Sequence, residues 1–540
     1  MVKMRSVWLC ICVTVAFAAL HLSCATWTPQ IVSNPLLAIH LRNVINVYVA
    51  EWLIYGILMM ILYRRSIRGS DPRSDHAQTA HQAHQRAPCS LPPLWLLSMC
   101  LISLRVTWWP SPPSSSEDVW RYLWDGQRFY EGLSVFTEAP LTAQFDQGSL
   151  YSELLPKIGH SEVPTVYPPG AQLCFWAISA LNHVFDGGLL GALLWWRALL
   201  LAFDLALLHA LSVLCRRLSV SRICLVAYTL CPLCGLESSL GAHLDLIGVT
   251  LMMLSLALAC YERWAWAGIA LGLSISVKFV PIIIVFALLS TILPAQTSLY
   301  RLRPRRRSVA KLTLGCTAAI LVTFSPFLRE LSHLGGLWPG LNTYATHWTF
   351  NGSLYPIIEW GIRAILRVWT FEEPLHLRQG IKVCSALLIC LIAWYLPRRS
   401  TQYAHGRDYH RHALNLNHRS VEHYIDQKLD LYSQQKLLQV CLVCISTFLL
   451  LSPVIYSWYL LWALPLATFV LGQHVTQPTS RVVFSLSALV WGALCVCTYL
   501  PRLRYLEDNI WYFSDLWLLM EYGTLGLTFV LATRYTLTSS

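Results

Sequence analysis

Long apolar runs, most of them close to the length that crosses a lipid bilayer, recur along the whole chain. A transmembrane helix needs about 20 mainly apolar residues. Continuous runs of this kind occupy residues 6–25, 44–63, 94–109, 189–214, 309–327, 381–396, 437–453, 458–473, 481–500 and 511–533.

A further stretch, residues 223–294, is also apolar, but ionisable residues interrupt it. The interruptions lie near Glu237 and at residues 243–245, 262–263 and 278–281, which suits four short spans. Together these runs predict an all-α integral membrane protein with about 14 transmembrane helices, in a plausible range of about 12–14. No internal repeat is evident, which weakens an interpretation as a transporter built from inverted repeats.

The basic residues between the runs predict the topology. The strongest clusters are Arg64-Arg65, Arg216-Arg217, residues 301–307 and Arg398-Arg399, and clusters of this kind are typical of cytoplasmic loops. With the N-terminus inside, all of them fall on the cytoplasmic side. This holds only if residues 167–184 form a helix outside the membrane rather than a span.

The first run, residues 6–25, follows Lys3 and Arg5, as the apolar part of a secretory signal does. Its length and the lack of a clear cleavage site favour a first transmembrane span over a cleaved signal peptide.

Polar interruptions divide the chain into three regions. Residues 1-93 comprise two spans and a polar cytoplasmic loop. Residues 94-380 form a membrane core with a long extracytoplasmic loop, 111-188, which we expect to contain helices. Residues 381-540 hold the C-terminal spans and a His-rich cytoplasmic loop, 397-436.

The composition excludes several classes of protein. Hydrophobic residues make up 55% of the chain and charged residues 13%, whereas a soluble domain has about 25% charged residues. This excludes a disordered protein and an ordinary soluble enzyme. The formal net charge is +12, but the basic residues form separate short clusters rather than one continuous face, so we expect no nucleic-acid partner.

Cysteine and histidine are expected to be structural or solvent-facing. Most of the 18 cysteines lie inside apolar runs, where a free cysteine behaves as a small hydrophobe. The pairs Cys231/Cys234 and Cys441/Cys444 have CxxC spacing but no partner motif nearby, so packing explains them better than zinc or redox chemistry. The histidines of 397-436 suggest solvent exposure more than a zinc site.

The first cluster with candidate chemistry follows the span that ends near residue 109. Ser116 can cap a helix whose first turn holds Glu117 and Asp118. On that helix Asp118, Arg121 and Asp125 lie near one face. A carboxylate there suits a general base or a ligand for a hydroxyl-rich molecule. The spacing is equally compatible with plain helix capping and a salt bridge.

A second group of ionisable residues lies at the interruptions of the apolar stretch. Glu237, His243 and Asp245 fall at a predicted outer turn, and ionisable groups so close to the hydrocarbon are often functional. His243 and Asp245 are too few ligands to establish a metal site.

Two further observations concern cations in or near spans. Lys278 is placed at the outer end of a span, where its ammonium suits an anionic headgroup such as a lipid phosphate; simple snorkelling explains it as well. Arg197 and Asp204 lie on one face of one predicted span, which suggests that they pair with each other.

Aromatic and proline residues mark three outer segments. Pro168 and Pro169 follow Tyr167 and suit the first turn of a helix. The other two segments contain His347 with Asn351, and Trp458 with Tyr459. Aromatics accompanied by an amide or hydroxyl suit carbohydrate stacking, and they equally suit the interfacial belt of a membrane protein.

The order of these segments resembles the GT-C superfamily of multispanning glycosyltransferases that use polyprenyl-phosphate sugars, and most closely its bacterial mannosyltransferase-like branch. The matching elements are Glu117-Asp118 with RYLWDG at 121–126, TVYPPGAQLCF at 165–175, His243 and Asp245, VKFVP at 277–281, and SPVIYSWYLLWALP at 452–465. The resemblance covers residues 94 to 475. It departs from the branch at Glu117 (commonly Asp), Leu244 (often Asn), Ser457 (commonly Pro) and residues 134–136 (usually NPY), which leaves the sugar and the acceptor open.

The resemblance implies an inverting transfer of a hexose, mannose in this branch, to an acceptor hydroxyl on the extracytoplasmic face. It places the catalytic carboxylate at Asp118, with Glu117 as the other candidate. The cations for the donor phosphate are then Lys278 first, followed by Arg121 and Arg329. The residues implied for substrate binding are Asp125, Tyr167, Pro168, His243, Asp245, His347, Asn351, Trp458 and Tyr459.

The resemblance also implies the partners: the bilayer, a polyprenyl-phosphate-linked sugar donor, and a glycan or glycolipid acceptor. Metal dependence varies in the family, so no metal ligand is assigned and a divalent cation stays open. A bacterial inner membrane is favoured, with the endoplasmic reticulum membrane as the alternative.

Two other functions compete with this one: a flippase or transporter of lipid-linked oligosaccharide without chemistry, and a polysaccharide polymerase or ligase. A transporter would carry its polar residues in the middle of spans. Here they lie at span ends on one side, so an enzyme is favoured and Asp118, Lys278 and His243 are expected to converge on one outer cavity.

Overall fold

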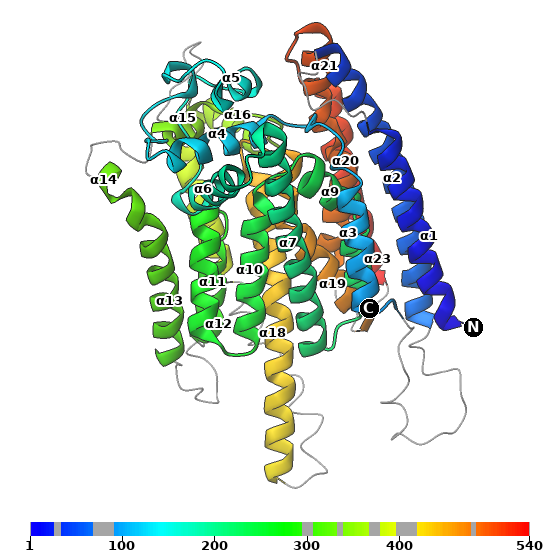
Figure 1. Ribbon diagram of the computed structural model, residues 1–540. Helices are drawn as coiled ribbons and strands as arrows, with labels where there is room; N and C mark the ends of the chain where they lie inside the picture. Colours follow the sequence, from blue (N-terminus) through cyan, green and yellow to red (C-terminus); the bar gives the residue numbers. More distant parts are fainter. Residues whose placement is uncertain are drawn as a thin grey trace.

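The computed structural model describes residues 2–25, 34–68, 91–293, 306–331, 339–366, 379–395, 418–476 and 482–538. Within these ranges the backbone forms helices and turns, and the only β-type pairing is an isolated bridge between Phe350 and Val454. The predicted all-α membrane protein is confirmed. Long helices run side by side in a bundle, and several short helices, among them α4 (Asp118–Tyr130), α5 (Leu150–Leu154) and α15 (Pro339–His347), gather at one of its ends (Figure 1).

The long elements follow the apolar runs of the sequence. They are α1 (Val2–Ser23), α2 (Asn34–Arg68), α3 (Leu94–Val106), α7 (Gly188–Arg217), α10 (Asp245–Cys260), α11 (Trp264–Val277), α12 (Ile282–Ile292), α13 (Arg306–Phe324), α18 (His418–Leu451), α19 (Leu464–Thr476), α20 (Val482–Leu494) and α23 (Thr524–Thr538). A helix over Gln379–Tyr395 completes this set.

The shorter elements connect them. They are α4 (Asp118–Tyr130), α5 (Leu150–Leu154), α6 (Pro169–Val184), α8 (Ile223–Thr229), α9 (Pro232–Gly235), α14 (Leu328–Leu331), α15 (Pro339–His347), α16 (Leu354–Leu366), α21 (Leu500–Asp508) and α22 (Asp515–Leu518), with 3-10 turns η3 (Pro140–Thr142), η4 (Leu155–Lys157), η6 (Ser325–Phe327), η7 (Ser457–Trp462) and η8 (Cys495–Tyr499), and π-helical turns η5 (Leu236–Leu240) and η9 (Leu519–Gly523).

Length and composition qualify seven helices of the described chain as membrane spans. An eighth span results if the bent pair Ile223–Thr229 and Pro232–Leu240, which turns by 50°, is counted as one. Five shorter apolar helices of 10–17 residues accompany them. The chain is therefore a multi-pass membrane protein, while the total of about 14 spans stays a prediction.

Three of the predicted interruptions of residues 223–294 are confirmed as the ends of helices, whereas Glu237 lies inside the helical segment Pro232–Leu240. The stretch folds as the bent pair followed by α10, α11 and α12, with breaks at residues 241–244, 261–263 and 278–281. The helix predicted over residues 167–184 is also confirmed, as α6. Its position outside the membrane stays a prediction.

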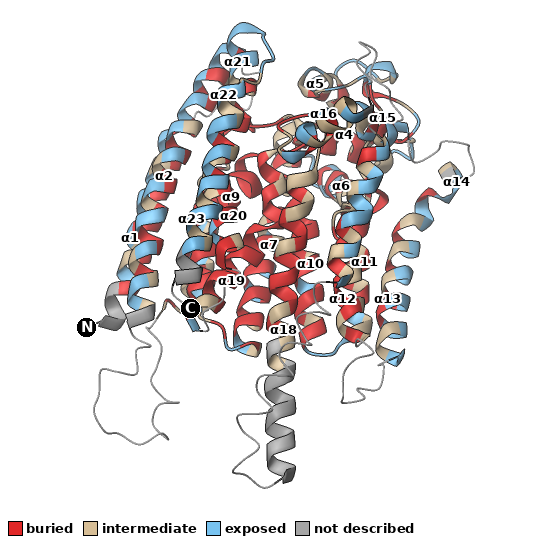
Figure 2. Cartoon of the chain, turned by 180° about the vertical axis from the view of Figure 1, so that it is seen from behind, coloured by how far each residue is buried: buried red, intermediate tan, exposed pale blue. Residues whose placement is uncertain are grey.

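Burial distinguishes the centre of the bundle from its outer helices. Buried residues concentrate on α7, α9, α10 and α19, whereas α1, α2, α13 and α23 present many exposed positions (Figure 2). Large apolar side chains such as Leu53, Leu314 and Leu321 are exposed on these outer helices. Such faces suit contact with lipid, because hydrocarbon tails replace the buried partners that a soluble protein would need.

The expected pairing of Arg197 with Asp204 is wrong. Seven residues on one helix span about 10.5 Å along the axis, too far for direct contact. Asp204 instead pairs with Arg105 of α3, with Nε to Oδ2 at 2.7 Å, and accepts hydrogen bonds from the hydroxyls of Tyr228 and Ser238. Arg197 donates to backbone carbonyls, which are those of Trp109, Ser111 and Leu240.

Both CxxC pairs are buried among apolar side chains, as their packing interpretation requires. Of the His-rich loop 397-436, residues up to 417 lie outside the described part. Across the described ranges, no group of three or more His, Cys, Asp or Glu side chains is arranged to hold a metal ion.

Helices α11 and α13 approach so closely that only glycine fits at the contact. A Cβ atom on Gly272 would lie 2.4 Å from the carbonyl oxygen of Cys316, and one on Gly268 would lie 2.1 Å from that of Leu312. Small residues at such contacts are typical of helix pairs in membranes.

We therefore expect Gly272→Ala to lower the free energy of unfolding by about 1–3 kcal/mol, the usual cost of overpacking. Thermal unfolding in detergent measures the effect. Gly361→Ala is the matched control, since a Cβ at Gly361 meets nothing within 4 Å. Equal unfolding midpoints for the two variants would contradict the tight contact.

Candidate active site

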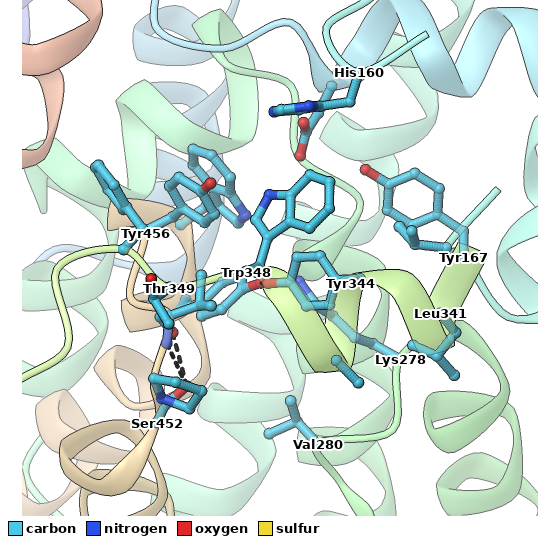
Figure 3. Close-up of a pocket in the computed structure, with 18 of the residues that line it drawn as sticks. His160, Tyr167, Lys278, Val280, Leu341, Tyr344, Trp348, Thr349, Ser452 and Tyr456 are labelled. Atoms are coloured by element: carbon cyan, nitrogen blue, oxygen red, sulfur yellow. Dashed lines mark hydrogen bonds between the residues drawn. The ribbon is translucent and has the colours of Figure 1, made fainter. Parts of the chain in front are cut away.

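Residues of α4 and α15, among others, line a cavity of about 1200 Å³. These two helices lie at one end of the bundle (Figure 1). The walls of the cavity come from segments far apart in the sequence, and Figure 3 shows side chains from several of them directed into one space. The contributing segments are residues 115–121, 159–168, 278–283, 341–350, 382–390, 448–459 and 498–511. Most outer motifs that the sequence analysis singled out therefore meet in one place.

Asp118 lies in the cavity wall at the start of α4. Its backbone N–H donates to Ser116 Oγ at 3.1 Å. The helix begins at Asp118 with Glu117 as its N-cap residue, so the predicted cap at Ser116 and the place of Glu117 in the first turn are each wrong by one residue. The neighbouring Glu117 forms an ion pair with Arg502, a partner that follows a distant span. The side chain of Asp118 is 34% accessible and faces the cavity.

The surroundings of Asp118 shift its titration. Burial in the cavity wall raises the pKa of Asp118 to about 6, with Asp245 and Glu117 adding to the rise while Lys278 and Tyr167 oppose it. Desolvation disfavours the charged carboxylate, and the negative charges of Asp245 and Glu117 raise its pKa further. A carboxyl group with a pKa near the working pH suits a general base.

The raised pKa gives a pH prediction. If deprotonated Asp118 is required, kcat/KM should be constant well above pH 6 and fall about tenfold per pH unit well below it. A pH profile of sugar transfer measures this fall. The variant Asp118→Glu should change the pH at which kcat/KM begins to fall on the acid side. A rate that does not change between pH 5 and 8 would contradict an ionised Asp118 as the active form.

Lys278 points into the same cavity (Figure 3). Its ammonium lies 2.7 and 2.8 Å from the two carboxylate oxygens of Asp245 and 4.3 Å from the centre of the Tyr459 ring. Asp245 also accepts a hydrogen bond from Trp462 Nε1 at 2.6 Å. These contacts hold Lys278 inward, which argues against snorkelling as the explanation of this residue.

Arg121 and Asp125 pair with each other, at 2.8 Å between Nε and Oδ1. Asp125 is buried and accepts a hydrogen bond from Thr165 Oγ1 at 2.5 Å, while Arg121 donates to the Val163 carbonyl at 2.8 Å. Asp125 does not line the cavity, so the expectation that it binds substrate does not fit this placement. Its hydrogen bond with Thr165, together with that of Arg121, holds residues 163–165 against α4. Arg121 does line the cavity.

His243 is fully buried behind Asp118 rather than in the cavity wall. Its Nδ1 lies 3.8 Å from Asp118 Oδ2, and its ring stacks on Trp458 at 3.9 Å between centroids. Asp118, Lys278 and His243 therefore converge as expected. Because His243 has no accessible surface, a direct contact with substrate does not fit the structure.

Two other predicted residues lie away from the cavity. Asn351 is buried and donates to the carboxylate of Glu521 at 3.2 and 3.3 Å, so it fixes the loop beside the cavity instead of lining it. Arg329 is exposed on α14, at the periphery of the bundle (Figure 1), because α13 carries this segment outward.

Aromatic side chains form much of the remaining wall. Trp458 stacks on Tyr456 at 4.4 Å, and the Tyr459 hydroxyl lies 2.5 Å from that of Tyr344. The other predicted residues of the wall are Tyr167, Pro168 and His347.

Several residues of the cavity are not among the predicted site residues. They include Arg502, Tyr344 and Trp348, while Tyr456 lies within the segment 452–465 without having been named as a site residue. Tyr344 and Trp348 stand close to His347 in the sequence, so their proximity to that motif was an available signal. Arg502 follows a predicted span as an ordinary basic residue, and nothing in the sequence indicates that it reaches Glu117.

Residues 5–293 match the family model described as alpha-(1->6)-mannopyranosyltransferase, N-terminal domain. The match covers more than half of the chain and includes Asp118, His243, Asp245 and Lys278. A comparison with curated proteins finds no match.

Proposed function

Because the chain belongs to the alpha-(1->6)-mannopyranosyltransferase family, and is thus a glycosyltransferase of the mannosyltransferase type, we propose that it transfers mannose from a polyprenyl-phosphate donor. The acceptor is a hydroxyl of a glycan or glycolipid, the reaction inverts the anomeric carbon, and the site faces the extracytoplasmic side.

One observation carries the proposal: a carboxylate and an ammonium line the same cavity. Asp118 supplies a base with a pKa near 6, and Lys278 supplies a cation held by Asp245. Transfer of a sugar from a phosphate needs both, since an acceptor hydroxyl loses a proton and the departing phosphate gains negative charge.

The lining of the cavity supports a lipid donor. Beyond Lys278 the wall continues through apolar side chains of α12, α18 and the helix Gln379–Tyr395, namely Ile282, Ile283, Ile389 and Phe448. A polyprenyl chain would bury its hydrocarbon against such a wall, whereas a nucleotide would find few polar partners there. The phosphate would then lie beside Lys278.

The transfer is a single displacement. Asp118 takes the proton of the acceptor hydroxyl, the hydroxyl oxygen forms a bond to the anomeric carbon, and the bond from that carbon to the phosphate oxygen breaks with its electron pair. An ammonium has three N–H donors, and two of those of Lys278 face Asp245, which leaves the third for the phosphate. Arg121 lies in the same wall.

Topology supports an extracytoplasmic site. The C-terminal end of α7, with Arg216 and Arg217, and the N-terminal end of α13 lie at the end of the bundle opposite α4 and α6 (Figure 1). Basic ends of spans favour the cytoplasm, so the cavity would open on the other side. A bacterial inner membrane is the proposed location.

The test is an assay of the purified protein in lipid vesicles with radiolabelled polyprenyl-phosphate mannose and a short mannoside acceptor. We expect a new mannoside whose anomeric configuration is opposite to that of the donor. Transfer from a nucleotide-linked mannose alone would overturn the donor assignment. Movement of lipid-linked sugar across the vesicle without a product would favour a flippase, and transfer of whole glycan chains would favour a polymerase or ligase.

A further inference from the structure

Behind Asp118 lie two fully buried ionisable side chains that the mechanism above does not use. They are His243 and Glu237, and we refer to them as the Glu237–His243 pair. His243 Nε2 lies 3.2 Å from Glu237 Oε2, and His243 Nδ1 lies 3.8 Å from Asp118 Oδ2. The imidazole therefore stands between two carboxylates, one in the cavity wall and one in the protein interior.

The local backbone is shaped to place this pair. Glu237 lies in the π-helical turn η5, and π-turns occur frequently at functional sites. The chain then passes Ala242 with φ of +53°, a conformation that is rare for a residue with a side chain. A Cβ on Gly241 would lie 2.6 Å from Glu237 Oε2 and 2.8 Å from His243 Cδ2, so only glycine allows the two side chains to approach at this turn.

Hydrogen bonds around Glu237 determine which of its oxygens faces the ring. Its Oε1 accepts from the hydroxyls of Ser457 and Tyr499, which leaves Oε2 for His243. Glu237 Oε2 lies 3.2 Å from Nε2 without the geometry of a hydrogen bond, and its negative charge favours the imidazole proton on Nε2, so the lone pair of Nδ1 faces Asp118. Burial and the nearby Lys278 lower the pKa of His243 well below its usual value, so the ring is neutral.

The separation of 3.8 Å between Nδ1 and Asp118 fits this arrangement. A lone pair and an ionised carboxylate have no proton to share, so no hydrogen bond forms between them, and within the described residues Nδ1 makes none. Once Asp118 has taken a proton, however, its O–H can donate to Nδ1. The stacked Trp458 holds the ring in the orientation that this bond needs.

We propose that His243 stabilises the protonated form of Asp118 by accepting a hydrogen bond at Nδ1 as the acceptor proton is transferred, and that Glu237 is a positioning residue that fixes the required tautomer. This rests on the proposed role of Asp118 as the base. The bond is absent before the transfer and present during it, so it lowers the barrier rather than only tightening substrate binding. The proton stays on Asp118 until it passes to water in the cavity after the product leaves.

The variant Glu237→Gln tests the proposal with almost no change of shape. Ser457 and Tyr499 would keep the amide oxygen on their side, so the amide NH₂ would face His243 Nε2 and move the ring proton to Nδ1. Nδ1–H would then donate to ionised Asp118 and weaken it as a base. We expect kcat to fall by about 10–100-fold, the usual loss for an outer-shell partner, with both KM values unchanged.

The pH profile separates this from a merely structural effect. The groups nearest to Asp118, which are Lys278, Asp245, Tyr167 and Glu117, stay the same in E237Q, while the negative charge of Glu237, which interacts with Asp118, is lost together with the original tautomer. The acid limb of kcat/KM should therefore move to lower pH than in the wild type, since the variant favours the ionised carboxylate. A wild-type kcat and an unmoved limb in folded E237Q would overturn the proposal.

The chain offers a matched control. Glu51 and His21 form a second buried carboxylate–imidazole contact, at 2.6 Å between α1 and α2 and outside the cavity lining. E51Q makes the same chemical change and is expected to leave kcat and the acid limb unchanged. His243→Phe, which keeps a ring against Trp458, gives an independent test if E237Q does not fold: a reduced kcat supports the proposal and a wild-type kcat rejects it.

D118N in the same assay shows whether the role of the Glu237–His243 pair or the role of Asp118 as the base is wrong. An inactive D118N beside a fully active E237Q would reject only the role of the Glu237–His243 pair. An active D118N would reject the proposed base itself.

Discussion

Replacing Asp118 with asparagine is expected to lower kcat by about 10²–10⁴-fold, the range that a general base contributes. Asparagine has the same shape but cannot take a proton from the acceptor hydroxyl. Because Ser116 Oγ binds the backbone N–H of residue 118 and not its side chain, the start of α4 should be unaffected. KM for donor and acceptor should therefore change little, and steady-state transfer from labelled polyprenyl-phosphate mannose measures both constants.

Glu117→Gln is the control for this prediction. Glu117 is one residue away and lines the same cavity, but it is engaged by Arg502. We expect a loss of less than about tenfold in E117Q, comparable to the loss of a partly exposed ion pair. If E117Q lost more activity than D118N, the base would be Glu117, and full activity in D118N would exclude Asp118 from the proton transfer.

The order of the helices was predictable because each apolar run is bounded by charged residues. The breaks at residues 241–244, 261–263 and 278–281 coincide with ionisable side chains in an otherwise apolar stretch. In a membrane protein an ionisable residue inside a span is costly, so the chain places it at a helix end. This also explains why Asp118, Lys278 and His243 could be expected to meet before the fold was known.

The partners of these residues were less predictable, because they depend on how distant helices pack. Asp204 pairs with Arg105, and Glu117 pairs with Arg502; no sequence spacing relates these positions. Asp125 shows a different limit. Its helical spacing from Asp118 suggested that both carboxylates face the substrate. In the structure Asp125 is buried and accepts a hydrogen bond from Thr165, which is a structural role.

Removing Lys278 should affect both stability and catalysis, and the two effects can be separated. Lys278→Met leaves Asp245, which is buried, with the Trp462 indole but without its cation. Leaving a buried carboxylate without its ion-pair partner costs about 3–5 kcal/mol. Thermal unfolding in detergent should show this loss, and kcat should fall by about 10²–10³-fold because the departing phosphate loses a preorganised cation.

The double variant K278M/D245N decides between a structural and a catalytic Lys278. Asparagine removes the charge that K278M leaves unpaired and keeps an oxygen for Trp462, so the unfolding midpoint should return to within a few degrees of the wild type. Activity should not return, since no ammonium then faces the phosphate. If the double variant recovered wild-type kcat together with its stability, Lys278 would serve only to neutralise Asp245, and the donor phosphate would have to rely on Arg121, the nearby cation in the same wall.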